Sequence, residues 1–340
     1  MLASPVPGTS PLNVSRGLVV AAGSLYLDRV TAEVVAAMRA DGIRPLLLKG
    51  PSIAAWLYGD GSSRPYGDVD LLVDARHRPA AEEVLRGLGF SRGQPGWQEL
   101  AWSWRRSGDG STVDLHRSIV GAEAGPEVVW RTLSERTEPM RVGGLEVEVL
   151  TPSGRALQVA LHAAKHGDSE VKPREDLVRA LEVVDEECWL EASALARRID
   201  AVPAFATGLR LDPEGARLAD RLDLTTERPT AVALRANRPR ALVLGIEQLA
   251  TARGVRSRLR FLARKAVPSR SYMRRTSALA RRGPLGLGLA YVWRPVWMLF
   301  KLPGAILTWR RARRDEETQP PADRADPVDH RQLSESDRRQ

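Results

Sequence analysis

The stretch "LLLKGPSIAAWLYGDGSSRPYGDVDLLV", residues 46–73, decides the fold of this chain. It opens with an apolar run that ends at Gly50, a pattern typical of a buried strand leading into a tight turn. Proline at the start and glycine at the end then predict a short helix over residues 51–59. A loop rich in glycine, serine and proline leads to "DVDLLV", which predicts a second strand. Two aspartates, Asp68 and Asp70, stand where that strand begins.

The two aspartates predict a metal site. Residues i and i+2 of a strand share a face, so Asp68 and Asp70 should project together. Carboxylates that close repel each other unless a cation neutralises them, although aspartates before an apolar run can also be simple turn residues. A third carboxylate, Asp114, lies in the strand-like "VDLH". Oxygen ligands suit Mg²⁺ or Mn²⁺, and three carboxylates on neighbouring strands can hold two ions for phosphoryl or nucleotidyl transfer.

The turn before the short helix predicts a phosphate site. Lys49, Gly50 and Ser52 offer an ammonium, a close backbone approach and a hydroxyl where a helix begins, and a helix N-terminus favours anions. The spacing is not that of a Walker A loop. For Lys49, and also for Arg64, a solvated loop charge is the competing interpretation.

Together these motifs resemble the uncharacterised nucleotidyltransferase family of the DNA polymerase beta-like superfamily. The resemblance rests on the opening stretch, on "VDLH" and on "LHAAKHG…REDL", and it covers about residues 20–190. It implies a metal-dependent enzyme that moves a nucleoside monophosphate from an NTP to an acceptor, with members near bacterial natural-product or peptide-modification gene clusters. The turn departs from the superfamily pattern, because Gly50 and Ser52 flank a proline where glycine and serine are usually adjacent.

The resemblance also implies a role for each residue of the site. Asp68 and Asp70 would bind both metal ions, whereas Asp114 would bind one and take the proton of the acceptor. The β and γ phosphates would be held by Lys49, Gly50 and Ser52. Arg64, which precedes the aspartates in the family's "R…DxDLLV" form, would neutralise the leaving pyrophosphate.

The histidines have two interpretations. His162 and His166 lie four residues apart on one helix face, a spacing that can bind zinc, but no HExxH glutamate accompanies them. A partly buried pair at a helix end is therefore the favoured interpretation. The resemblance adds a cleft-lining role for this helix and the next one, with Lys165, His166 and Asp176 touching nucleotide or acceptor. His116, two residues after Asp114, would point the same way.

The order of elements predicts an α+β fold. A helix over residues 24–40 precedes the opening stretch, and strands follow in "ELAWSWRR", "STVDLHRSI" and "LEVEVL". From Thr151 or Ser153, both candidate caps, the pattern becomes helical. We expect a small mixed-sheet nucleotidyltransferase domain followed by a helical domain and a basic amphipathic C-terminal region. The expected segments are a disordered lead-in 1–20, the mixed-sheet domain 21–150, the helical domain 151–235, the basic helical region 236–314 and a disordered polar tail 315–340.

Charge is concentrated near the C-terminus. The chain carries a net charge of +9, yet residues 235–314 hold 20 arginines and lysines against one acid, Glu247. Such a region suits a polyanionic partner. Trp293, Trp297 and Trp309 alternate with basic residues, which favours an amphipathic element at an anionic membrane surface, formed by residues 255–314. A lid packed on the catalytic body, or facing the acceptor, is the alternative, while no helix-turn-helix, zinc or RNA-binding signature supports sequence-specific nucleic-acid binding.

From the remaining composition we expect a cytoplasmic enzyme, and the basic C-terminal region adds the expectation of peripheral contact with the inner membrane face. One cysteine, Cys188, excludes a disulfide framework, and the N-terminus shows no signal-peptide pattern. Two other functions stay open: another metal-dependent phosphotransferase, and a catalytically silent, membrane-associated accessory protein of a biosynthetic cluster. Loss of any one of the three aspartates would favour the silent protein, and all three are present.

Overall fold

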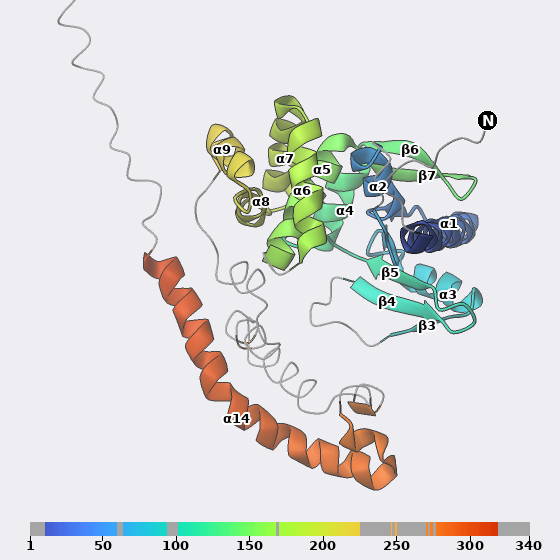
Figure 1. The fold of residues 1–340 in the computed structure, drawn as a ribbon, viewed down its shortest axis with the longest axis vertical. Helices are drawn as coiled ribbons and strands as arrows, with labels where there is room; N and C mark the ends of the chain where they lie inside the picture. Colours follow the sequence, from blue (N-terminus) through green and yellow to red (C-terminus); the bar gives the residue numbers. More distant parts are fainter. Residues whose placement is uncertain are drawn as a thin grey trace, which may run out of the picture.

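The computed structural model describes residues 11–59, 64–93, 101–167, 170–224 and 277–318, with isolated positions between 225 and 276. Within these ranges the strands form one seven-stranded mixed sheet in the order β3-β4-β5-β2-β1-β7-β6 (Figure 1). The strands are β1 (Leu46–Leu47), β2 (Val69–Leu72), β3 (Phe90–Arg92), β4 (Ala101–Arg106), β5 (Thr112–His116), β6 (Thr137–Val142) and β7 (Leu145–Leu150). The opening stretch supplies the two central strands, β1 and β2, which pair antiparallel.

Two parallel pairings hold the centre of the sheet. β2 pairs with β5, and β1 pairs with β7, each in parallel. The outer hairpins β4–β5, β3–β4 and β6–β7 are antiparallel. The predicted strands around "LLLKG", "DVDLLV", "ELAWSWRR", "STVDLHRSI" and "LEVEVL" are thereby confirmed, and with them the mixed-sheet α+β fold.

The helices cover both faces of the sheet. The helices in chain order are α1 (Pro11–Ala40), α2 (Pro51–Leu57), α3 (Arg78–Gly87), α4 (Pro126–Ser134), α5 (Pro152–His166), α6 (Val171–Val183), α7 (Glu186–Arg198), α8 (Val202–Leu209) and α9 (Pro213–Arg221). Thr151 caps α5 from the position just before the helix: its hydroxyl accepts a hydrogen bond from the Gly154 amide at 3.4 Å, so the first of the two candidate caps is the one used.

Alternate residues of the central strands feed two separate cores. Leu47 and Leu71 pack with α1 and α3, whereas Leu46, Leu48 and Leu72 pack with the cluster that runs through α5–α9. This is the period of two that a strand imposes on its side chains. Figure 1 shows α6–α9 gathered on one side and α1 and α3 on the other. The boundary expected at residue 150 therefore falls between elements that share one core.

Several elements differ from the sequence-based expectation. Helix α1 begins at Pro11, within the segment expected as a disordered lead-in. The helix α4 and the strands β3 and β6 were not expected, and β6 contains Pro139, which fits its place at the edge of the sheet. Residues 1–10 of the lead-in, most of residues 225–276 and residues 319–340 of the tail lie outside the described part of the chain.

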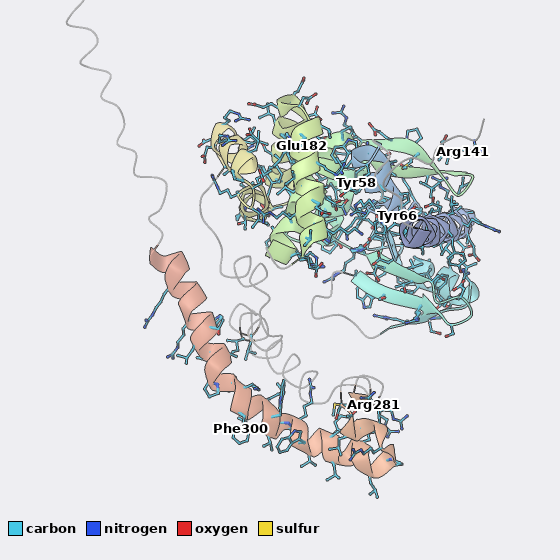
Figure 2. All side chains as sticks on the ribbon, viewed as in Figure 1. Tyr58, Tyr66, Arg141, Glu182, Arg281 and Phe300 are labelled. Carbon is cyan, nitrogen blue, oxygen red and sulfur yellow. The ribbon has the colours of Figure 1, made fainter. Side chains whose placement is uncertain are left out.

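A long helix, α14 (Gly283–Thr318), follows the short 3₁₀ turn η2 (Leu279–Arg281) and packs against it. It passes through Pro295 and Pro303 without a break and continues past residue 314, where a disordered tail was expected. Figure 2 shows the side chains of Arg281 and Phe300 on this part of the fold. Within the described residues, no helix combines the length and the apolar character that crossing a bilayer requires.

Candidate functional site

The parallel register of β2 and β5 brings the carboxylates together. Asp70 is the direct partner of Asp114, and Leu72 is the partner of His116. Val113 and Leu115 alternate with them and enter the core shared with α1 and α3. Asp70, Asp114 and His116 therefore share the opposite face, which looks toward α5 and α6.

Asp70 is the most deeply placed of the three aspartates, with 5% of its surface exposed. One of its oxygens, Oδ1, lies 3.2 Å from the Lys49 ammonium and 2.8 Å from Nε2 of His116. Burial alone would raise the pKa of this carboxyl. The charge of Lys49 and the hydrogen bond with His116 outweigh it and hold the pKa well below its usual range. Asp70 is thus an anion already matched by cationic or donor groups.

Asp114 has an unsatisfied oxygen. Its Oδ1 atom is buried and has no hydrogen-bond partner within the described part of the chain. A buried carboxylate oxygen without a partner is costly, and a cation would supply one. Ligand atoms of Asp70, Asp114 and His116 lie within 4.8 Å of one another. The donor set and the orphaned oxygen both fit a divalent metal.

Asp68 lies immediately before β2 and lines the same cleft. Burial raises its pKa, and the negative charges of Asp70 and Asp114 raise it further. This crowding is what a cation between the carboxylates would relieve. Asp68 does not belong to the compact group of ligand atoms that Asp70, Asp114 and His116 form.

A cationic wall faces the carboxylates. The last turn of α5 carries Lys165 and His166, and the first turn of α6 carries Lys172. Burial lowers the pKa of Lys165, as does the nearby charge of Lys49. Burial and Arg64 lower the pKa of Lys172 in the same way. These ammonium groups crowd one another, an arrangement that a polyphosphate would stabilise.

The two histidines of α5 differ in their surroundings. Their rings meet edge to face with centroids 4.7 Å apart. His162 is deeply placed, and its pKa is lowered well below 6.5 by burial and then by Lys49. Burial lowers the pKa of His166 as well, and its Nδ1 lies 3.0 Å from the carboxylate of Glu170. Both line the cleft.

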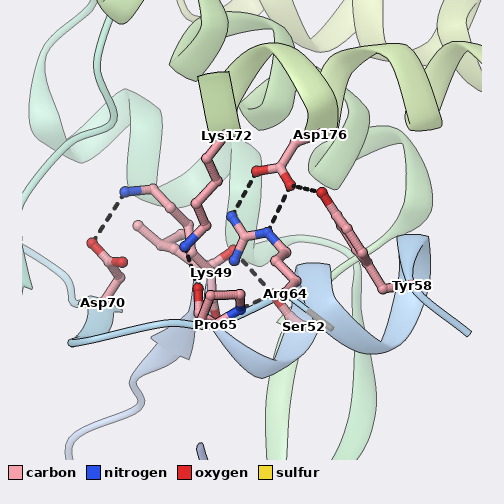
Figure 3. Close-up of polar contacts among 9 residues, drawn as sticks. Lys49, Ser52, Tyr58, Arg64, Pro65, Asp70, Lys172 and Asp176 are labelled. Carbon is pink, nitrogen blue, oxygen red and sulfur yellow. Dashed lines mark hydrogen bonds and ion pairs between the residues drawn. The ribbon is translucent and has the colours of Figure 1, made fainter. Parts of the chain in front are cut away.

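Arg64 and Asp176 form a buried ion pair, drawn in Figure 3. The guanidinium donates to both oxygens of Asp176, at 2.7 Å and 2.6 Å, and Tyr58 donates to the same carboxylate at 2.9 Å. Asp176 is 2% exposed and does not line the cleft, whereas Arg64 does. The pair ties the segment before β2 to α6.

Further contacts fix the same segment. The Tyr66 hydroxyl donates to Asp28 of α1 at 2.6 Å, and the Lys172 ammonium donates to the carbonyl of Pro65 (Figure 3). Together with Arg64, these contacts anchor residues 64–66 to helices on both faces of the sheet. The approach to Asp68 is therefore held in place.

In the turn before α2, Gly50 lies where the prediction requires it, whereas Ser52 does not. Gly50 adopts φ 65° and ψ −117°, a conformation that only glycine takes without strain. Ser52 is fully buried, and its hydroxyl donates to the carbonyl of Leu48 at 3.1 Å. Gly50 borders the cleft and Ser52 does not.

A cleft of about 380 Å³ unites most of the predicted residues. The predicted residues that line it are Lys49, Gly50, Arg64, Asp68, Asp70, Asp114, His116, Lys165 and His166. The sequence did not single out Lys172, Tyr66, Gln158 or Glu170, which also line it. "VKP" after the histidine helix was the available signal for Lys172, since it places a lysine in the first turn of the next helix.

Solved structures with a similar arrangement share little sequence with this chain. Antibiotic-resistance factor ANT(2")-Ia with adenylyl-2"-tobramycin is 16% identical at a TM-score of 0.39, covering 51% of this chain and 98% of that one. Lincosamide adenylyltransferase LnuA with lincomycin is 14% identical at 0.32, covering 45% and 94%. An antigenic nucleotidyltransferase-like protein from Paracoccidioides brasiliensis is 15% identical at 0.35, covering 63% and 97%. None of the curated proteins matches this chain.

The family model gives the assignment. The model described as "Uncharacterised nucleotidyltransferase" matches residues 15–214, which include the whole sheet, the carboxylates and the helices α5 to α8. This confirms the resemblance found in the sequence. The chain belongs to the uncharacterised nucleotidyltransferase family and is a nucleotidyltransferase.

Proposed function

We propose that this enzyme moves a nucleoside monophosphate from an NTP to a hydroxyl, amine or phosphate of a small-molecule or peptide acceptor, releasing pyrophosphate. The observation that carries the proposal is the pairing of Asp70 with Asp114 on adjacent parallel strands. Across the cleft from them stand Lys165 and Lys172. An acidic edge that faces a cationic wall suits a polyphosphate bound with a divalent cation.

Asp68, Asp70 and Asp114 are the residues that would hold Mg²⁺ or Mn²⁺. Such an ion, when bound, neutralises phosphate charge and polarises phosphorus–oxygen bonds. Lys49 and Lys172 would bind the β and γ phosphates, and Gly50 would let the backbone approach them. Arg64 reaches the cleft from its ion pair with Asp176 and would act through its charge.

For a hydroxyl or amine acceptor, the reaction needs a base. A new bond forms between the acceptor atom and the α phosphorus, while the bond from that phosphorus to the bridging oxygen breaks. Pyrophosphate leaves with the electron pair of the broken bond, and so with its negative charge, on the side where Lys165 and Lys172 stand. The acceptor's proton would go to the Asp114 carboxylate, as the family resemblance implies.

Calorimetry of each NTP with Mg²⁺ tests this function. Wild-type protein should bind at least one NTP in a metal-dependent way, and the double variant Asp68→Ala with Asp70→Ala should lose that binding. Asp41→Ala, an exposed aspartate at the end of α1, is the matched control and should bind as wild type does. A folded wild-type protein that binds no NTP would contradict the proposal and favour the silent accessory protein.

We also propose that α14 touches an anionic membrane surface. Nine large apolar side chains of this helix are exposed: Leu285, Leu289, Val292, Trp293, Val296, Trp297, Leu299, Phe300 and Leu307. Spaced three and four residues apart, most of them form a stripe along the helix. Arg281 and Arg282 stand before the stripe and Lys301 and Arg310 after it, all exposed. Apolar and aromatic groups between cations are the pattern of an interfacial helix on anionic lipid.

A further inference from the structure

The proposed metal site contains a nitrogen donor. His116 follows Asp114 by two residues on β5, so both side chains lie on the face that carries Asp70. This placement is a consequence of backbone register, which fixes the imidazole on the strand rather than on a mobile loop. Strand-borne ligands are held more closely in position than loop-borne ones.

The distances bring the imidazole to the carboxylates. His116 Nε2 lies 2.8 Å from Asp70 Oδ1. Donor atoms of Asp70, Asp114 and His116 all lie within 4.8 Å of one another, the range that ligands of one ion span. The ring is half-buried, and the orphaned oxygen of Asp114 is turned away from solvent. An ion held by these groups would take the place of the His116–Asp70 hydrogen bond and would put a cation beside the Asp114 carboxylate.

From these observations we infer that His116 Nε2 is a metal ligand, so that Asp70, Asp114 and His116 form a mixed nitrogen–oxygen site. The inference rests on the proposed function and specifies its cofactor. Mg²⁺ prefers oxygen ligands, whereas imidazole suits transition metals, and Mn²⁺ accepts carboxylate as well. The site therefore favours Mn²⁺ over Mg²⁺.

Pulsed electron paramagnetic resonance of bound Mn²⁺ tests the ligand directly, because the electron spin couples to a coordinated nitrogen nucleus. Mn²⁺ is added to the full chain, first alone and then with each NTP. Wild-type protein should show imidazole ¹⁴N coupling, which becomes ¹⁵N coupling when histidine is labelled. His116→Asn should lose the coupling and bind Mn²⁺ at least about tenfold more weakly.

Two further variants separate the role of His116 from a general effect on the fold. His166→Asn changes another histidine of the cleft and should keep the nitrogen coupling. His116→Asp replaces the nitrogen with oxygen, so it should restore metal binding without the coupling and should shrink the preference for Mn²⁺ over Mg²⁺. Thermal unfolding of each variant reports whether it is folded, and a wild-type spectrum without nitrogen coupling would overturn the His116 ligand even where a variant fails to fold.

The outcomes distinguish this inference from the function on which it rests. Mn²⁺ bound without any nitrogen coupling would overturn the His116 ligand and leave metal-dependent nucleotidyl transfer standing. Coupling that persists in folded His116→Asn would overturn it too, because another histidine would be the source. Absence of Mn²⁺ binding, with or without NTP, would overturn the His116 ligand, and absence of Mg²⁺-dependent NTP binding as well would overturn the proposed function.

Discussion

The ion pair between Arg64 and Asp176 holds in place a residue that lines the cleft, although Asp176 itself lies outside the cleft. Replacing Asp176 with alanine would leave a buried guanidinium without its partner, which typically destabilises a protein by about 3–5 kcal/mol. Urea unfolding of Asp176→Ala should show a loss of this size. Glu135→Ala, which removes an exposed pair with Arg198, is the matched control and should cost less than about 1 kcal/mol. Equal losses in the two variants would contradict the prediction.

Lys49 binds an oxygen that the proposed metal site requires. Its ammonium lies 3.2 Å from Asp70 Oδ1, so a divalent ion must compete with it. A nearby opposite charge shifts the pKa of a carboxylate by about 1–3 units, and the effect on metal affinity should be comparable. Lys49→Ala should therefore bind Mn²⁺ about tenfold more tightly without nucleotide, yet bind NTP more weakly. Titrations of Mn²⁺ and of NTP measure the two opposite changes in affinity. Lys301→Ala is the control. Weaker Mn²⁺ binding by Lys49→Ala would contradict the proposed competition.

His162 should make the free energy of unfolding sensitive to acid. Burial and Lys49 keep its folded pKa well below the value of about 6.5 expected in the unfolded chain. Below about pH 6.5, His162 takes up a proton in the unfolded chain but not in the folded one. The free energy of unfolding, highest above that pH, therefore decreases as the pH falls. Between pH 7.5 and 5.5, metal-free wild type should lose about 1 kcal/mol more than His162→Asn.

Urea unfolding at the two pH values checks this prediction. His77→Asn changes an exposed histidine just before α3 and should keep the acid sensitivity of wild type. If His162→Asn kept it as well, the acid sensitivity would belong to other groups.

At the scale of elements, α8 packs closely against α5 at Gly208. A Cβ atom on Gly208 would stand 1.9 Å from the carbonyl oxygen of Ala160, so no side chain fits there. Gly208→Ala must push the helices apart, which should lower the free energy of unfolding by about 1–3 kcal/mol or more. Gly87→Ala, at the end of α3 with open space around it, is the matched control and should be neutral or slightly stabilising.

The central strands and the carboxylates could be predicted from the sequence because their signals are local. Alternation around "DVDLLV" and the aspartate spacing need only a few neighbouring residues. The strand β6 was missed because Pro139 weakens its pattern and its partner β7 supplies the pairing. Arg64 and Asp176 lie 112 positions apart in the sequence, and the residues next to either one in the sequence do not indicate their contact. Lys172 joins the site only because α6 places its first turn beside Pro65.

At the scale of the whole molecule, we propose different tasks for the acidic site and for the basic helix α14. Co-sedimentation with vesicles tests the task proposed for α14. The full chain should bind phosphatidylserine-rich vesicles more strongly than phosphatidylcholine vesicles, and the preference should weaken with salt. Trp293→Ser with Phe300→Ser should reduce binding, because each exposed ring contributes apolar area.

Leu190→Ser, an exposed apolar residue of α7, is the control for this experiment and should leave vesicle binding unchanged. NTP binding by the α14 variants should match that of wild type. Binding that is equal for both lipid compositions would contradict a role for the basic residues.

Helix α5 is buried along most of its length, from Ser153 to Leu161, and the same helix presents His162, Lys165 and His166 to the cleft. One helix therefore serves both the core and the wall that faces the reacting groups. Attempts to redirect the enzyme toward new acceptors by laboratory evolution should find very few tolerant positions on this wall. A library restricted to these three residues would avoid the buried positions of α5. Broader mutagenesis of the helix would yield mainly unfolded protein.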